Sequence, residues 1–370
     1  MPVKRLYSKW MYDWETRMTT RDNNRVVRPF EWGTEWTRDF PQAEGIYPEG
    51  EVTFDDTQSY FLELNRRIVA DSDRFFAYQP PSDFHLTHRT MPGEQSSSHW
   101  LHFTSPVQTQ HSNNDHVRAR WFPAIEKKGP RTGQHNKKAV VLLPHWNSKP
   151  HSYVALCRIL QKLGLSTLRL SLPYHDARLT AETQRSDYAV SSNVGRTIAA
   201  TRQAVIDARA CFDWLEQQGY EDFGIVGTSL GSCYAFLASA HDRRIRVNAF
   251  NHASTFFADV VWSGQSTRHI RAGLEGMISL ETLRDAWAAI SPPSYWPKFK
   301  DQQHKKILII YAAYDRTFLP EFSKQVVEGF AESGLDHKVK VLPCGHYSTG
   351  ETPFKFIDGW HIGKFLKTSL

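Results

Sequence analysis

Cysteine is scarce in this chain, and its placement excludes two kinds of site. The 370 residues include only four cysteines, which lie far apart, and no pair has the CxxC spacing of a zinc or redox site. A chain of this length can bury enough apolar surface to fold without disulfide bonds or a structural metal. We therefore expect the four thiols to be reduced and to have no part in the chemistry.

Long apolar runs and blocks of like charge are also missing. The 45 Lys and Arg and 39 Asp and Glu residues give a net charge of +6, spread along the chain, which is weak evidence for a nucleic-acid partner. The first residues, MPVKRLYSKWMYDWETRM, contain neither the apolar core of a signal peptide nor an 18-residue apolar span. We expect a cytoplasmic protein with no integral membrane segment and no nucleic-acid partner.

The composition changes near residue 135. Residues 1–135 are rich in Trp, His, Pro and Asn, and we interpret them as an aromatic-rich arm followed by the first strands of the sheet, at 98–105 and 116–124. Trp32 and Trp36 in the arm could stack on sugar rings. Packing of the arm on the domain, or on a second subunit of a homo-oligomer, is the favoured interpretation.

From residue 136 onward, strands and helices alternate regularly. Strands separated by helices imply parallel pairing through right-handed crossovers, so the predicted fold class is α/β, a doubly wound, mostly parallel sheet with helices on both faces. Residues 254–300 break this pattern with short helical stretches and a loop rich in Pro, Trp and Tyr. We predict a helical cap at 254–300, inserted into a core formed by 136–253 and 301–370. The predicted strands are 139–143, 166–172, 223–227, 245–250, 305–315 and 338–342, and the predicted helices are 151–164, 195–219, 229–241, 320–334 and 354–367.

The pentapeptide Gly227-Thr228-Ser229-Leu230-Gly231 matches G-x-S-x-G. It directly follows a predicted strand and opens an apolar helix, which is the context of a strained turn that presents a nucleophilic serine. The alternative is a glycine-rich turn that merely starts a helix. The context favours Ser229 as a nucleophile.

A serine hydroxyl needs a base, and the base needs an acid that orients it. Asp315 follows the strand ILIIYAAY, and His346 stands in the loop CGHYSTG after the strand KVKVL. On this interpretation of the strands, no other histidine stands after a late strand. Because each of the three residues follows a strand of the predicted parallel sheet, all three lie at the carboxyl edge of that sheet, in the chain order Ser, Asp, His. Asp315 could instead cap a helix, and His346 could be an unremarkable loop residue.

Acyl transfer also needs two hydrogen-bond donors for the developing oxyanion. The backbone N–H of Leu230 would supply one. The second should come from the loop after the strand 139–143, which resembles in its place the His-Gly-x loop of many α/β hydrolases. Because the third residue of that loop gives the N–H, the resemblance favours Asn147 over Trp146. His145 in the same loop is interpreted as structural rather than as a second base.

The block 139–369 resembles the α/β-hydrolase superfamily. Within it, Leu172-Pro173-Tyr174-His175, the helix end CFDWLEQQGY, the motif GTSLG and the segment NHASTFFADVVWSG resemble the abhydrolase-domain family eighteen and its bacterial relatives. This resemblance implies an α/β-hydrolase fold, with the family's Ser, Asp and His at Ser229, Asp315 and His346.

The leading hypothesis is therefore a serine esterase that cleaves a small carboxylic ester through an acyl-enzyme on Ser229, without a cofactor. One alternative is a peptidase or amidase of the oligopeptidase type, although the first 135 residues lack the repeats of a propeller. A second alternative is a non-catalytic binding protein on the same scaffold.

Two further groups of residues have side chains that could form a site. His85 with His88, and His99 with His102, have HxxH spacing, but residues i and i+3 of a strand point to opposite faces, so we expect no metal site. Aromatic residues of the cap could line an acyl pocket, or they could simply fold the cap. The candidates for this pocket are Phe256, Phe257, Trp262 and Trp296.

Overall fold

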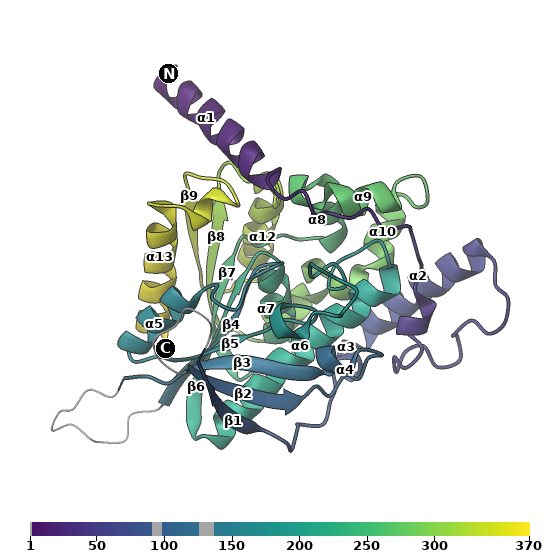
Figure 1. The fold of residues 1–370 in the computed structure, drawn as a ribbon, viewed down its shortest axis with the longest axis horizontal. Coiled ribbons are helices and arrows are strands. Elements are labelled where there is room, and N and C mark those ends of the chain that lie inside the picture. The colour runs from purple at the N-terminus through teal and green to yellow at the C-terminus, as the bar shows by residue number, and fades with distance from the viewer. Residues whose placement is uncertain (1, 91–97, 126–136) are drawn as a thin grey trace.

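The computed structural model describes residues 2–90, 98–125 and 137–370 (Figure 1). Its named strands form one nine-stranded sheet in the order β1-β2-β3-β5-β4-β6-β7-β8-β9. Pairing is antiparallel from β1 to β5 and parallel from β5 to β9. The predicted fold class is therefore confirmed. The strands are β1 (His85–Arg89), β2 (Ser98–Thr104), β3 (His116–Phe122), β4 (Lys137–Leu143), β5 (Ser166–Leu170), β6 (Tyr220–Thr228), β7 (Ile245–Asn251), β8 (Lys306–Ala312) and β9 (His337–Leu342).

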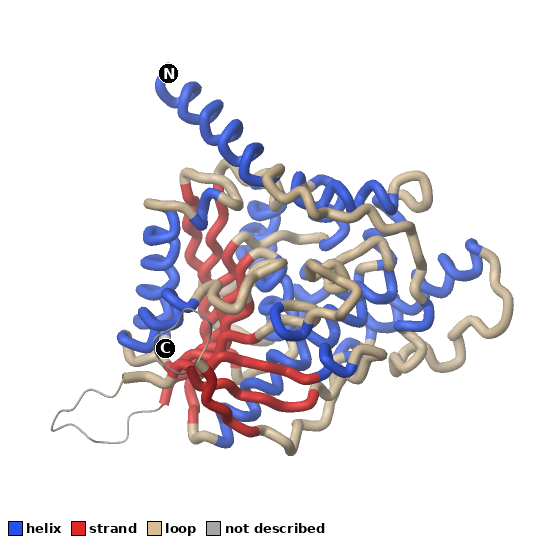
Figure 2. Tube along the Cα trace, viewed as in Figure 1, coloured by secondary structure: helices blue, strands red, loops and turns tan. Residues whose placement is uncertain are grey.

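Helices cover both faces of this sheet (Figure 2). Every helix that the sequence predicted is present, with ends displaced by up to three residues. The α-helices are α1 (Pro2–Thr19), α2 (Phe54–Ala70), α3 (Ser72–Phe75), α4 (Ser112–Asp115), α5 (Val154–Lys162), α6 (Val194–Gln217), α7 (Leu230–Ala240), α8 (Phe257–Ser263), α9 (Arg268–Leu274), α10 (Leu280–Ala286), α11 (Trp296–Lys300), α12 (Pro320–Glu332) and α13 (Phe354–Ser369).

The two faces of the sheet carry separate hydrophobic cores. Successive side chains of a strand point to opposite faces, so the continuous apolar run of β4 supplies both cores. Val140 and Leu142 pack with α5 and α13, whereas Val141 and Leu143 pack with α6, α7 and the helices between β7 and β8. This arrangement explains why β4 lacks the alternation of a strand with one exposed face.

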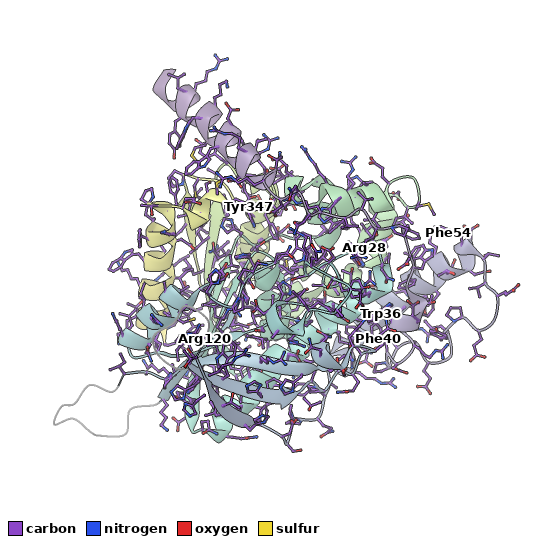
Figure 3. The ribbon with its side chains drawn as sticks, in the orientation of Figure 1. Arg28, Trp36, Phe40, Phe54, Arg120 and Tyr347 are labelled. Carbon is purple, nitrogen blue, oxygen red and sulfur yellow. The ribbon has the colours of Figure 1, made fainter. Side chains whose placement is uncertain are left out.

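The described part of the N-terminal arm contains α1, α2 and the one-turn helix α3, none of which the sequence pattern predicted. The N-terminal end of α1 projects from the body of the molecule (Figure 1). Further along, the arm packs on the chain itself: the Trp32 ring stacks on Phe61 of α2 with centroids 5.1 Å apart, and the Trp36 ring stacks on His111 at 5.9 Å. Figure 3 labels Trp36, Phe40 and Phe54 in this part of the molecule, where Phe40 is buried. A homo-oligomer through the arm stays a prediction.

The segment 254–300 connects β7 to β8 and contains α8, α9, α10 and α11. Its assignment as a cap, like the other domain boundaries, stays a prediction. The expected boundary near residue 135 lies outside the described residues. Within the described part of the chain, no helix combines the length and the hydropathy needed to cross a membrane.

Candidate active site

The turn between β6 and α7 holds Ser229 in an unusual backbone conformation. Its φ is 57° and its ψ is −122°, and positive φ is uncommon outside glycine. The backbone N–H of Ser229 donates to the carbonyl oxygen of Asn251 at 2.8 Å, which ties the turn to the end of β7. A Cβ on Gly227 would collide with the carbonyl oxygen of Gly231, and one on Gly231 with that of Leu143. Close backbone contacts therefore require both glycines of the motif.

Hydrogen bonds connect Ser229, His346 and Asp315. His346 Nε2 lies 2.9 Å from Ser229 Oγ, and His346 Nδ1 lies 2.8 Å from Asp315 Oδ2. Asp315 follows β8 and His346 follows β9, so both side chains reach the site from the carboxyl ends of their strands. The structure thus brings together the three residues that the sequence singled out. The arrangement can carry a proton from the hydroxyl to the imidazole, with the carboxylate to stabilise the imidazolium.

The carboxylate of Asp315 is buried, with 2% of the residue's surface exposed, and both of its oxygens accept hydrogen bonds. The backbone N–H groups of Thr317 and Phe318 donate to Oδ1 at 2.7 and 2.8 Å. Burial by itself would raise the pKa of Asp315, but the His346 charge and the hydrogen bonds from His252 and His346 hold that pKa well below its usual range. Burial lowers the pKa of His346, whereas Asp315 raises it, and the net direction is upward.

A second histidine, His252, contacts the same carboxylate. His252 Nδ1 lies 3.1 Å from Asp315 Oδ2, and the His252 and His346 rings have centroids 4.5 Å apart. Sequence reasoning missed this residue, although the signal was present, because His252 directly follows β7 just as His346 follows β9. The statement that no other histidine stands after a late strand was wrong.

The loop of His346 is also fixed by a carboxylate from α1 that the sequence did not reveal. Glu15 is fully buried, and its Oε1 accepts a hydrogen bond from the backbone N–H of Tyr347 at 2.7 Å. Its Oε2 accepts from the backbone N–H of Ser348 at 3.1 Å and from the Ser348 hydroxyl at 2.9 Å. Burial raises the pKa of Glu15, against the opposing effect of these hydrogen bonds. Tyr347 lies at the base of α1 (Figure 3).

The three candidate donors for an oxyanion differ in their hydrogen bonding. Leu230 begins α7, directly after Ser229. The backbone N–H of Asn147 donates to His175 Nε2 at 3.1 Å, so it is already engaged. No acceptor among the described residues is found for the backbone N–H of Trp146. The hydrogen bond from Asn147 to His175 could not be foreseen from the sequence. Because it occupies the Asn147 N–H, it favours Trp146 over Asn147 as the second donor.

A cavity of about 760 Å³ opens beside Ser229. One set of its lining residues comes from the segment 254–300, and another comes from α5 and α13, which lie on the opposite side of the sheet from that segment (Figure 1). His145 also lines the cavity, where burial lowers its pKa to about 3 and its Nδ1 lies 2.8 Å from the Tyr153 hydroxyl, as expected of a neutral, structural residue.

Only one of the four aromatic residues predicted for the pocket lines this cavity. Phe257 does so, together with Val260 and Val261. The Phe256 ring lies under the Arg284 guanidinium, and the Trp262 ring under that of Arg271. The Trp296 ring packs against Phe236 and Phe330, away from the cavity. The sequence could not reveal which face of these short helices is turned to Ser229.

The HxxH histidines meet partners on the neighbouring strand. The register of β1 and β2 puts His85 opposite His102, and His88 opposite His99. His102 Nδ1 lies 3.1 Å from His116 Nε2, and burial lowers the pKa of His102 to about 4. Among the described residues, the one group of three potential metal ligands with atoms close together is His252, Asp315 and His346. The Nδ1 atoms of His252 and His346 each form a hydrogen bond to Asp315 Oδ2.

The family described as "alpha/beta hydrolase domain containing 18" matches residues 75–273, more than half of the chain. No curated protein matches the sequence.

Solved structures with a similar fold include acetyl xylan esterase 1 from Thermoanaerobacterium sp. JW/SL YS485. Its TM-score is 0.57 at 13% identity, over 85% of this chain and 93% of the esterase. The acylaminoacyl peptidase of Pyrococcus horikoshii has a TM-score of 0.54 at 11% identity, over 78% of this chain and 42% of the peptidase. A puromycin-hydrolyzing peptidase of Mycobacterium tuberculosis has a TM-score of 0.53 at 13% identity, over 77% and 45% of the two chains. This chain therefore spans less than half of either peptidase. At identities this low, the structural similarity shows a shared fold alone.

Proposed function

Since this chain belongs to the α/β-hydrolase family described as "alpha/beta hydrolase domain containing 18", we propose that it is a serine hydrolase acting on a carboxylic ester. The observation that carries the proposal is the pair of hydrogen bonds from His346 to Ser229 and Asp315, at 2.9 and 2.8 Å, beside a large cavity. The positive φ of Ser229 further supports the proposal, because strained backbone is concentrated at functional sites.

In the proposed reaction, Ser229 Oγ attacks the acyl carbonyl carbon while its proton passes to His346 Nε2. The tetrahedral intermediate collapses as the C–O bond to the leaving group breaks, and His346 returns the proton to the departing alkoxide. A water molecule then attacks the acyl-enzyme, giving its proton to His346, and the free acid leaves as Ser229 regains its proton. Asp315 orients the imidazole and stabilises its positive charge in both halves of the reaction.

The oxyanion hole in this proposal consists of the backbone N–H groups of Leu230 and Trp146. Leu230 is the residue after the nucleophile, at the N-terminus of α7, where backbone donors are free of helix partners. Trp146 replaces Asn147 in this role, because the Asn147 N–H is bonded to His175.

The segment 254–300 acts as the cap in this proposal, and it provides one wall of the substrate pocket. Phe257, Val260 and Val261 present apolar side chains to the cavity beside Ser229. An apolar wall favours an uncharged acyl or aryl group over a polyanion.

The three N-terminal strands give the peptidase alternative less support than the esterase. The strands β1, β2 and β3 extend the same sheet as the core instead of forming a separate domain in front of it. A non-catalytic protein would have no need for a base and an acid in hydrogen-bond contact with the serine.

Labelling with a fluorophosphonate, followed by assays on p-nitrophenyl esters of increasing chain length and on peptide p-nitroanilides, tests the proposal. We expect covalent labelling at Ser229 and faster turnover of the esters. Preferred turnover of the anilides would favour the peptidase alternative. A folded protein that neither reacts with the probe nor hydrolyses any of these substrates would contradict the proposal.

A further inference from the structure

We propose that His252 is a positioning residue of this site, whose Nδ1–H holds the carboxylate of Asp315 in place for His346. The inference rests on the proposed hydrolase function and adds a fourth side chain to it. It follows from the sharing of one carboxylate oxygen: His346 Nδ1 lies 2.8 Å from Asp315 Oδ2, and His252 Nδ1 lies 3.1 Å from the same atom.

The contact determines the tautomer of His252. An ionised carboxylate only accepts hydrogen bonds, so the nitrogen that faces Asp315 must carry the proton. In the neutral ring the proton is then on Nδ1, and Nε2 is an acceptor. Nε2 is buried and has no hydrogen-bond partner among the described residues.

His252 occupies a position that is costly in two ways. Its φ is +53°, in the left-handed region that non-glycine residues seldom adopt. Its second ring nitrogen is a buried acceptor without a partner in the described part of the chain, although such groups are normally satisfied in folded proteins. Strain of this kind persists where the surrounding structure holds it in place, most often at functional sites. Both costs are therefore explained if this conformation is needed to bring Nδ1 into contact with Asp315.

The backbone of His252 is connected to the nucleophile as well as to the acid. Its N–H donates to the carbonyl oxygen of Ile310 in β8 at 2.7 Å. The Ser232 hydroxyl lies 3.1 Å from the carbonyl oxygen of His252 and 2.7 Å from that of Ser229. The residue before it, Asn251, accepts the N–H of Ser229. His252 is thus held at a junction of β7, β8 and the serine turn.

Burial and the neighbouring His346 keep the His252 ring neutral during the reaction. Burial lowers the pKa of His252, and the nearby His346 lowers it further, against the opposing effect of Asp315. His145 on the β4 side is itself neutral, because burial lowers its pKa to about 3. The charge of Glu15, from α1, raises the pKa of His346. A neutral donor steadies Asp315 without placing a second positive charge beside the imidazolium.

Loss of this donor should have a specific effect on His346. Asp315 would keep its charge but lose one of its four hydrogen bonds, so the carboxylate would attract the proton of the imidazolium more strongly. The pKa of His346 would rise, and the acid limb of the pH profile would move to higher pH. A residue that only fills space would leave that limb where it is.

The test compares His252→Asn with His252→Leu, two side chains of the same branched shape. Asn keeps an N–H donor near the position of Nδ1 and tolerates the left-handed backbone, whereas Leu offers no donor. On a p-nitrophenyl ester we expect His252→Leu to lower kcat by about tenfold, with KM changed by less than about twofold, and to move the acid limb of kcat/KM up by about half a pH unit or more. His252→Asn should recover most of kcat and of the limb position. His252→Ala removes the ring without adding bulk, so the comparison stands if the Leu variant fails to fold.

A second measurement needs no substitution at 252. In Ser229→Ala protein with ¹⁵N-labelled histidine, NMR should find His252 as the neutral tautomer with its proton on Nδ1. The Nε2–H tautomer, or a folded Leu or Ala variant with the wild-type acid limb, would overturn the proposal. The same ester assay on wild-type and Ser229→Ala proteins tests the hydrolase function separately. An active Ser229→Ala enzyme would contradict that function, whatever the result for His252.

Discussion

The carboxylate of Glu15 accepts a hydrogen bond of 2.7 Å from the backbone N–H of Tyr347, which stands 332 residues further along the chain. Glu15 belongs to the N-terminal helix, and Tyr347 follows the base His346. The helix α1, whose N-terminal end projects from the body (Figure 1), thus anchors the loop that carries the proposed base. A Cβ on Gly345 would collide with the Glu15 side chain, so the loop and the helix meet without spare room.

We predict that Glu15→Gln lowers kcat by about tenfold or more and destabilises the protein by about 1–3 kcal/mol. The amide cannot accept all three hydrogen bonds, and its NH₂ group would face a backbone N–H or the Ser348 hydroxyl. Ester kinetics and thermal unfolding check both effects. Asp13→Asn, on the exposed side of the same helix, is the matched control and should change neither. Wild-type kcat in Glu15→Gln would show that the anchor does not matter for the reaction.

Ser229→Ala should reduce ester hydrolysis by about 10³-fold or more and leave the melting temperature within about 2 °C of wild type. The substitution removes the nucleophile, so only the oxyanion donors and substrate binding can contribute. Ser263→Ala, an exposed serine in the segment 254–300, controls for the loss of a hydroxyl. If Ser229→Ala keeps a tenth of the wild-type rate, Ser229 is not the nucleophile.

The rate should depend on pH through His346, which must be neutral to accept the serine proton. Burial lowers the pKa of His346, but Asp315 and Glu15 together raise it by more, so the acid limb of kcat/KM should lie above the ordinary histidine value of about 6.5. Below that limb, kcat/KM should fall about tenfold per pH unit, and above it the profile should be flat. Circular dichroism at each pH shows whether the protein stays folded. An acid limb below the ordinary histidine value contradicts the assigned coupling to Asp315.

The sequence was sufficient to predict the core and the order of the three central residues, because both follow from local patterns. Apolar runs between helices identify parallel strands, and the carboxyl ends of parallel strands meet at one edge, so Ser229, Asp315 and His346 could be brought together without a structure. Glu15 could not be found in this way, because nothing local links α1 to a loop at the far end of the chain. The choice between Asn147 and Trp146 depended on His175, which only the folded loop brings into contact.

A crystal structure of the fluorophosphonate adduct would test the oxyanion donors. The phosphoryl oxygen should lie about 2.7–3.1 Å from the backbone nitrogen atoms of Leu230 and Trp146. Asn147 should keep its bond to His175. An adduct in which the Asn147 nitrogen contacts that oxygen, and no longer contacts His175, would restore the assignment made from the sequence.

Two aromatic residues of the same helix should differ in their effect on the preferred length of the substrate. Phe257 and Trp262 both belong to α8, yet of these two only Phe257 lines the cavity, while the Trp262 ring lies under the Arg271 guanidinium. Truncation of Phe257 to Ala should enlarge the acyl pocket and remove apolar contacts with longer chains. We expect Phe257→Ala to change the ratio of kcat/KM for hexanoate and acetate p-nitrophenyl esters by about fivefold or more, because about 1 kcal/mol of apolar contact is involved. Trp262→Ala, which removes an aromatic side chain from the same helix, should leave that ratio within about twofold. Equal shifts in both variants would mean that α8 affects the reaction through its stability, and the cap would then have no direct part in chain-length preference.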